Sequence, residues 1–153
     1  MADFPKVIGD SSIQGVNTAD YNGFAKTIVC GATTIAADRL GAMLAVGTSD
    51  GLAYVASDTA ARRVVGIIAG GDTNVDGVVA TSGQNVIAKA GVFTFANDSA
   101  GTPVTNAHLM QKCYVKDYKT VSAATGSNSV IAGTVIALEN GKVAVSVGMS
   151  YVA

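Results

Sequence analysis

The residue types of this chain favour β-strands and leave little material for helices. Its 153 residues include 21 Val, 9 Ile and 14 Thr, against 5 Leu, 3 Gln and a single Glu. Branched side chains fit the pleated, half-buried surface of a sheet, whereas straight-chain helix formers are scarce here. The 18 glycines recur in turn signals, among them Asp50-Gly51, Asp76-Gly77 and Asn140-Gly141, at intervals typical of a sandwich or barrel. We therefore predict an all-β fold, a compact β-barrel or β-sandwich-like domain.

Apolar runs between these turn signals give the positions of the expected strands. The predicted strands are residues 24–30, 41–47, 52–56, 64–69, 86–90, 92–96 and 111–115. The strongest local signal is a C-terminal β-hairpin over 133–147, because Asn140-Gly141 can adopt the positive φ angles of a tight turn. In this hairpin Val143, Val145 and Val147 should face the core, and Lys142, Ala144 and Ser146 the solvent or a neighbour. The one helical candidate is 57–63, a connector of a turn or two that begins with capping residues.

The first 23 residues differ from the rest of the chain. Isolated apolar residues alternate there with Gly, Ser, Asn and Asp, and no core period is visible. We expect residues 1–23 to form an extended N-terminal arm and residues 24–153 to form a single β domain, since a core of this size buries about 70% of the unfolded surface. The arm either packs on its own domain or contacts a neighbour. The candidate contacts are Phe4, Pro5, Val7, Ile8, Ile13 and Tyr21.

Charge and hydropathy exclude several classes of partner. The formal net charge is −1, and the ten basic residues are spread along the chain, so direct nucleic-acid binding is not expected. The densest basic features, Arg62-Arg63 and the group of Lys112, Lys116 and Lys119, are interpreted as solvated faces. The longest uncharged stretch, 120–138, is interrupted by polar residues, so no membrane span is expected. Residues 1–6 lack a secretion signal, which predicts that the chain stays in the cytoplasm where it is made.

The chemically reactive residues do not form a recognisable catalytic or metal-binding pattern. Cys30 and Cys113 lie far apart without a CxxC motif, so two free thiols are expected, although a buried bridge between them remains open. His108 is the only imidazole and is interpreted as structural, and most aspartates lie in turn sequences. The run 72–77 lacks the closing Glu of a calcium loop. Phe93 and Phe95 are assigned a core or interface role. We expect no enzyme activity, cofactor or metal.

Four segments, in order, resemble one protein family. They are Gly91-Val-Phe-Thr-Phe-Ala-Asn-Asp98, Gln111-Lys-Cys-Tyr-Val-Lys-Asp-Tyr-Lys-Thr-Val-Ser122, Ala132-Gly-Thr-Val-Ile136 and Lys142-Val-Ala-Val-Ser-Val147. Their order is similar to that of the bacteriophage capsid cement proteins, also called head decoration proteins, in which a G-V-F-x-F strand precedes a C-Y-V-x-D-x-x-T-V strand, an A-G strand and a terminal hairpin. Residues 41–47 and 64–70 resemble the paired small-residue strands of that family. The resemblance spans about residues 24–147.

The resemblance implies a viral structural protein without catalytic residues or cofactors. Such a protein binds the outer surface of an icosahedral phage head and cements neighbouring major capsid subunits, which stabilises the expanded shell. The implied partners are the major capsid protein and further copies of the chain itself, with a trimer favoured and a dimer possible. The implied location is the virion, on the outer surface of the head, after assembly in the host bacterial cytoplasm.

Three other functions compete with this one. An enzyme on a small β-barrel would need a cleft of titratable groups, and only 14% of the residues are charged. Another phage structural module, such as a tail or head fibre component, fits the composition almost as well. A small-ligand-binding β domain is the third alternative, against which the 6% aromatic content argues. In the cement interpretation, the arm adds a strand to a neighbouring sheet and its apolar side chains fill pockets there.

Overall fold

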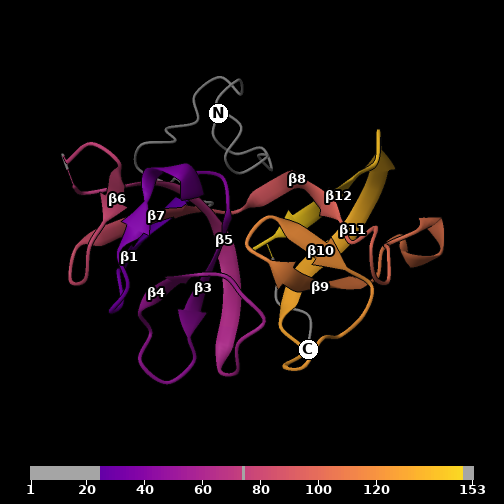
Figure 1. The fold of residues 1–153 in the computed structure, drawn as a ribbon, viewed down its shortest axis with the longest axis horizontal. Coiled ribbons are helices and arrows are strands. Elements are labelled where there is room, and N and C mark those ends of the chain that lie inside the picture. Colours follow the sequence, from indigo (N-terminus) through magenta and orange to yellow (C-terminus); the bar gives the residue numbers. More distant parts are fainter. Residues whose placement is uncertain (1–24, 74, 150–153) are drawn as a thin grey trace, which may run out of the picture.

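The computed structural model describes residues 25–73 and 75–149, which form twelve β-strands and two short 3₁₀ helices (Figure 1). In chain order the elements are β1 (Ala25–Val29), β2 (Ile35–Ala36), η1 (Ala37–Arg39), β3 (Met43–Gly47), β4 (Ala53–Val55), β5 (Arg62–Gly71), β6 (Val78–Ala80), β7 (Asn85–Lys89), β8 (Gly91–Asn97), η2 (Asn106–His108), β9 (Lys112–Asp117), β10 (Thr120–Ser122), β11 (Ile131–Glu139) and β12 (Lys142–Val147). The predicted all-β class is confirmed. Neither described helix is long enough to span a membrane.

The strands form two five-stranded units that lie side by side (Figure 1). The first unit is a sheet in the order β1-β7-β5-β3-β4, and its two edges are joined by a single parallel bridge between Cys30 and Ala53. A small pair, β2 with β6, is added to it. The second unit is a closed barrel in the order β10-β8-β12-β11-β9, in which the one parallel pair, β10 with β8, completes the circle. Only Ala90 separates β7 from β8, so one unit follows the other directly.

The two units have the same topology. With β2 and β6 left aside, the five strands of each unit can be numbered in sequence order. The first strand then pairs with the fifth, the fifth with the fourth, the fourth with the second and the second with the third, all antiparallel. The third strand then meets the first in parallel. Thus β1, β3, β4, β5 and β7 correspond to β8, β9, β10, β11 and β12. A 3₁₀ helix precedes the second strand in both units.

The correspondence extends to irregular details. Val65 in β5 and Ala132 in β11 both interrupt the register with the second strand, and a further irregularity follows Ile68 in one unit and Val135 in the other. Hydrogen bonds agree as well: the Gly41 N–H donates to Ile68 O at 2.9 Å, and the Met110 N–H to Val135 O at 2.8 Å. The connection between the fourth and fifth strands differs, because in the first unit it is longer and contains β6.

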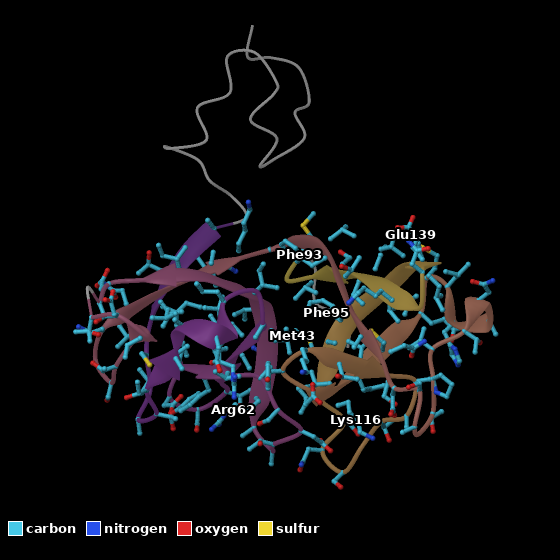
Figure 2. All side chains as sticks on the ribbon, turned by 45° about the horizontal axis from the view of Figure 1, so that its top comes forward. Met43, Arg62, Phe93, Phe95, Lys116 and Glu139 are labelled. Carbon is cyan, nitrogen blue, oxygen red and sulfur yellow. The ribbon has the colours of Figure 1, made fainter. Side chains whose placement is uncertain are left out.

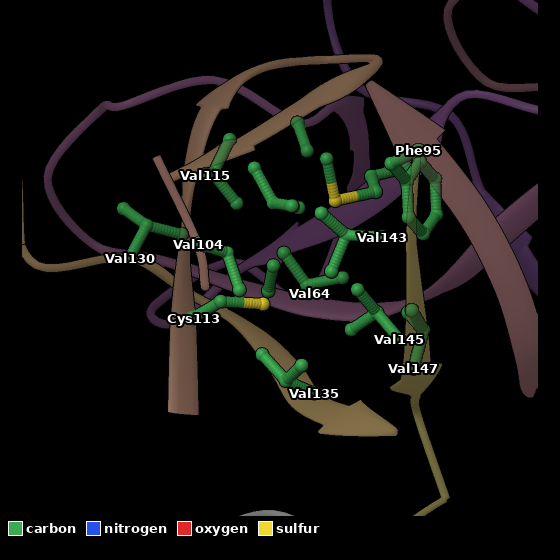
Figure 3. Close-up of a cluster of buried hydrophobic side chains, with 14 of the residues drawn as sticks. Val64, Phe95, Val104, Cys113, Val115, Val130, Val135, Val143, Val145 and Val147 are labelled. Carbon is green, nitrogen blue, oxygen red and sulfur yellow. The ribbon is translucent and has the colours of Figure 1, made fainter. Parts of the chain in front are cut away.

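Each unit has its own apolar core, and the second core extends into the first unit. The first core contains Leu44, Ile68, Val86 and Ala88, all 0–1% exposed. The second is built mainly from barrel valines (Figure 3) and also takes in four buried residues of the first unit. These four are Met43, Ala45, Ala56 and Val64. The units are therefore joined by continuous apolar packing.

Most of the predicted strands are found, with shifted ends. The 133–147 hairpin is confirmed: Asn140 and Gly141 have φ angles of 52° and 77°, and Val143, Val145 and Val147 are fully buried. On its other face Ala144 is only 9% exposed, so part of that face also packs. The helical candidate 57–63 is wrong, because Ala61 has a positive φ of 60° and the two arginines belong to β5. Strands β2, β6 and β10 and the internal duplication were not predicted.

Candidate interaction surface

The six predicted contact residues of the N-terminal arm lie outside the residues that the structure describes. They are Phe4, Pro5, Val7, Ile8, Ile13 and Tyr21. The arm over 1–23 therefore stays a prediction.

The two cysteines are buried free thiols in different cores, so the bridge left open above is not present. Burial raises the pKa of the Cys113 thiol to about 12, and burial also raises the pKa of Cys30 above its ordinary value. A thiol must ionise to act as a nucleophile or metal ligand. Neither side chain is thus poised for that chemistry.

His108 has a structural contact that also shapes the surface beside it. Its Nδ1 accepts the Thr105 backbone N–H at 2.9 Å, and the Thr105 hydroxyl oxygen accepts the Ala107 N–H at 3.3 Å, which forms a capping box at η2. Two residues further on, Met110 has a positive φ of 64°. Its counterpart in the first unit is Gly41, which has a φ of 86°. This backbone turn leaves the Met110 side chain 71% exposed.

Several charged side chains make structural contacts with other side chains. Asp98 accepts the Ser122 hydroxyl at 2.9 Å and lies 3.3 Å from the Lys116 ammonium, and the Ser122 hydrogen bond is the largest cause of its lowered pKa. The Arg62 guanidinium lies 3.9 Å from the Tyr54 ring centre. Within residues 25–73 and 75–149, no group of three or more His, Cys, Asp or Glu side chains could hold a metal ion.

The contact between the two units, here called the seam, is the best-defined interface in the molecule. In Figure 2, Met43 lies between the two units near Phe95 of β8, and both side chains belong to the same buried cluster. The Met43 N–H donates to the Tyr118 carbonyl at 2.9 Å, and the Arg39 guanidinium lies 4.0 Å from the Tyr118 ring centre. The seam therefore brings η1 and β3 of the first unit against β8 and the β9–β10 turn of the second.

Further seam contacts involve one groove and one pair of loops. A groove of about 340 Å³ places Leu40 and Gly41 across from Ala96 of β8. At another point the Asp58 carboxylate accepts the backbone N–H groups of Ser127 and Asn128 at 2.8 and 2.9 Å. These residues belong to the loops that connect the third and fourth strands in each unit, so corresponding loops meet there.

The outer face of β9 is an open surface of the second unit. A hollow of about 500 Å³ opens there, lined by His108, Met110, Gln111, Lys112, Tyr114, Ala123, Thr125 and Thr134. Leu109, beside it, is 40% exposed. The sequence carried no signal for this surface, because Lys112 and Tyr114 read as the polar side of an ordinary strand.

At the opposite end of the molecule, the outer face of β1 and β7 is also open. Thr27 pairs with Ile87, and Val29 pairs with Asn85, all on the side away from the core residue Val86. Val29 is 41% exposed and Ile87 is 39% exposed. Large apolar side chains in these positions are candidates for contact with another protein surface.

Comparison with known proteins adds no relative to this description. No family model, no curated protein and no solved structure matches the chain.

Proposed function

We propose that this protein is a structural component of a bacteriophage virion that binds the outer surface of the head and cements neighbouring major capsid subunits. The observation that carries the proposal is the position of the four segments that resemble head decoration proteins. Residues 91–98 contain β8, 111–122 contain β9 and β10, 132–136 fall in β11, and 142–147 are β12. Together they supply every strand of the closed barrel.

The first unit supports the same proposal. The segments 41–47 and 64–70, which resemble the paired small-residue strands of that family, contain β3 and most of β5. These strands correspond in topology to β9 and β11. The resemblance thus falls on equivalent strands of both units, as expected if each unit is one copy of the same module.

A cement role needs binding surfaces rather than a reactive centre. A protein that binds only the expanded shell stabilises that state by RT ln(1 + [L]/Kd), about 2.7 kcal/mol per site at one hundred times Kd. Copies that are linked to one another bind more tightly still, because the second contact forms at high effective concentration. The barrel interior, where small β-barrels otherwise hold a ligand, is filled by side chains such as Val135, Val143 and Val145.

The test is co-sedimentation of the purified full chain with expanded, undecorated heads, with unexpanded heads as the comparison. We expect saturable binding to expanded heads, and decorated heads should survive heating or chelator treatment that bursts bare ones. A variant lacking residues 1–23 measures how much the arm contributes to the affinity for heads. A large loss of affinity is expected if the arm adds a strand to a capsid sheet. Binding to no form of the head would contradict the proposal and favour a tail or fibre component.

A further inference from the structure

The internal duplication allows the two units to be compared face by face. Strand β3 is buried on both sides: Leu44 points into the first core, while Met43 and Ala45 lie in the seam. In the corresponding strand β9, only alternate residues are buried. The positions that match Met43 and Ala45 are Lys112 and Tyr114, which line the open hollow. The same face is therefore covered in one unit and uncovered in the other.

The seam also shows which surface covers that face. Met43 meets the β9–β10 turn, where its N–H donates to the Tyr118 carbonyl, and Leu40 lines a groove with Ala96 on the outer side of β8. In the first unit, the corresponding surface is the β3–β4 turn and the outer side of β1, where Val29 takes the place of Ala96. This surface is open at the far end of the molecule. Among residues 25–73 and 75–149, each half of the seam thus has one counterpart that the seam does not cover.

Both open surfaces carry apolar side chains at positions that match residues of the seam groove. Leu109 and Met110 correspond to Leu40 and Gly41, which line that groove together with Ala96 of β8. Leu40 is 53% exposed at the groove, and Leu109 and Met110 are 40% and 71% exposed. On the other open surface Val29, the counterpart of Ala96, is 41% exposed, so both sides of the groove have apolar counterparts.

The loop contact at Asp58 indicates how the units are related in space. The Asp58 loop meets its own counterpart at Ser127 and Asn128, and β5 meets its counterpart β11, whereas η1 and β3 meet β8 and the β9–β10 turn. When units are arranged head to tail by rotation, only residues close to the rotation axis meet their counterparts. The relation between the units is therefore a rotation with its axis near these loops.

We propose that a second copy of this chain docks head to tail on the outer face of β9, presenting the outer face of its β1 and its β3–β4 turn. The contact repeats between chains the seam that joins the units within a chain. Lys112 then takes the place of Met43 and faces the turn that carries Asp50 of the next copy, which adds a charge attraction. The inference does not rest on the proposed function, because it follows from the duplication alone.

The contact between chains is weaker than the seam. Lys112, Tyr114 and Thr134 replace Met43, Ala45 and Ile67, so docking on the open face has to desolvate an ammonium and two hydroxyl groups that the seam lacks. These polar side chains keep the separate chain in solution until a partner docks. Association is therefore reversible and depends on concentration.

The first measurement is the solution mass of the full chain by light scattering over a range of concentrations. A single chain has a mass of 15.3 kDa, and we expect a larger species that dissociates on dilution. Met110→Asp on one surface and Val29→Asp on the other should each weaken association about tenfold or more, a loss of roughly 1.4 kcal/mol. Val75→Asp is the matched control: Val75 is 65% exposed but lies in the β5–β6 connection, which the second unit lacks.

Mixing the two variants tests the head-to-tail geometry. Met110→Asp keeps an intact β1 face, and Val29→Asp keeps an intact β9 face, so an equimolar mixture should form a complex of one copy of each. Circular dichroism checks that both variants fold, and Leu109→Asp with Ile87→Asp repeats the experiment at neighbouring positions. The proposal is overturned if the unmodified chain stays monomeric at every concentration, if Val75→Asp weakens association as much as the others, or if the mixture restores no complex.

Discussion

Burial determines what the thiols of this protein can do. Cys113 is completely buried, and its sulfur has one weak polar contact, 3.7 Å from the Gly133 carbonyl oxygen. The charged thiolate is disfavoured among valine side chains, so the pKa of the thiol rises to about 12. The sequence did indicate free thiols from their spacing, but the depth of their burial depends on which strands pair.

The raised pKa of Cys113 makes stability fall at alkaline pH. The folded protein keeps the proton up to about pH 12, whereas the unfolded thiol releases it near 9.0. Between these values the unfolded state binds fewer protons, so this group lowers the free energy of unfolding by about 1.4 kcal/mol per pH unit. Below pH 9 its contribution is constant.

Urea unfolding of the unmodified chain and of Cys113→Ala, at several values between pH 8 and 10.5, checks this expectation. Cys113→Ala loses packing at every pH, but it lacks the thiol whose ionisation lowers the free energy of unfolding at alkaline pH. The difference in unfolding free energy between the two proteins should therefore shrink as the pH rises above 9. A difference that stays constant across this range would contradict the assigned pKa.

Strands β5 and β11 show how a single backbone position is constrained by a neighbouring strand. Gly66 and Gly133 occupy corresponding positions, and a Cβ added at either one would collide with backbone of the fifth strand. At Gly66 the nearest atom is the Lys89 carbonyl oxygen, 2.7 Å away, and at Gly133 it is the Ser146 carbonyl oxygen. Glycine is required there because two backbones approach closely.

We expect Gly133→Ala to lower the free energy of unfolding by about 1–3 kcal/mol, since the added methyl group forces the backbone of β12 to move. Gly70→Ala is the control in a strand of the same kind. A Cβ at Gly70 would meet only the Ile87 Cδ1 atom, at 3.7 Å. Chemical denaturation followed by circular dichroism measures both variants. Equal stabilities for Gly133→Ala and Gly70→Ala would show that the close approach is not limiting.

The sequence predicted long strands better than short ones. Seven of the expected ranges match strands because they carry three or more apolar or β-branched residues between turn signals. Strand β10 has three residues, Thr120–Ser122, which is too short for a period of two to be visible. Its position is fixed instead by pairing with β8 and by the Ser122–Asp98 hydrogen bond. Such contacts join residues far apart in the chain.

The duplication could not be read from the sequence, because a barrel interior accepts many apolar side chains. Leu44, Ile68 and Ala88 correspond to Cys113, Val135 and Val145, and each is 0–1% exposed. Apolar character is retained at these positions, while residue identity and the volume at each position are not. On the outside, the two copies have different neighbours and have diverged further. The candidate surface on β9 is recognised from the difference between the two units, so the sequence did not predict it either.

Continuous packing through the seam predicts that the two units unfold together. Met43 is 0% exposed and belongs to the core that contains the barrel valines. Met43→Ala should lower the free energy of unfolding by about 2–5 kcal/mol. Hydrogen exchange should then show reduced protection in both β3 and β12. Met149→Ala is the control, because Met149 is 43% exposed and its truncation should cost under about 0.5 kcal/mol. Unchanged protection in β12 would show that the units unfold independently.

The one-residue junction at Ala90 keeps the two units next to each other by a covalent connection, whereas two separate units would meet only as often as their concentration allows. Because both units have the same topology, each strand position is present twice in one chain, in two different surroundings. The second strand is fully buried at Met43 in one unit, and its counterpart Lys112 lines an open hollow in the other.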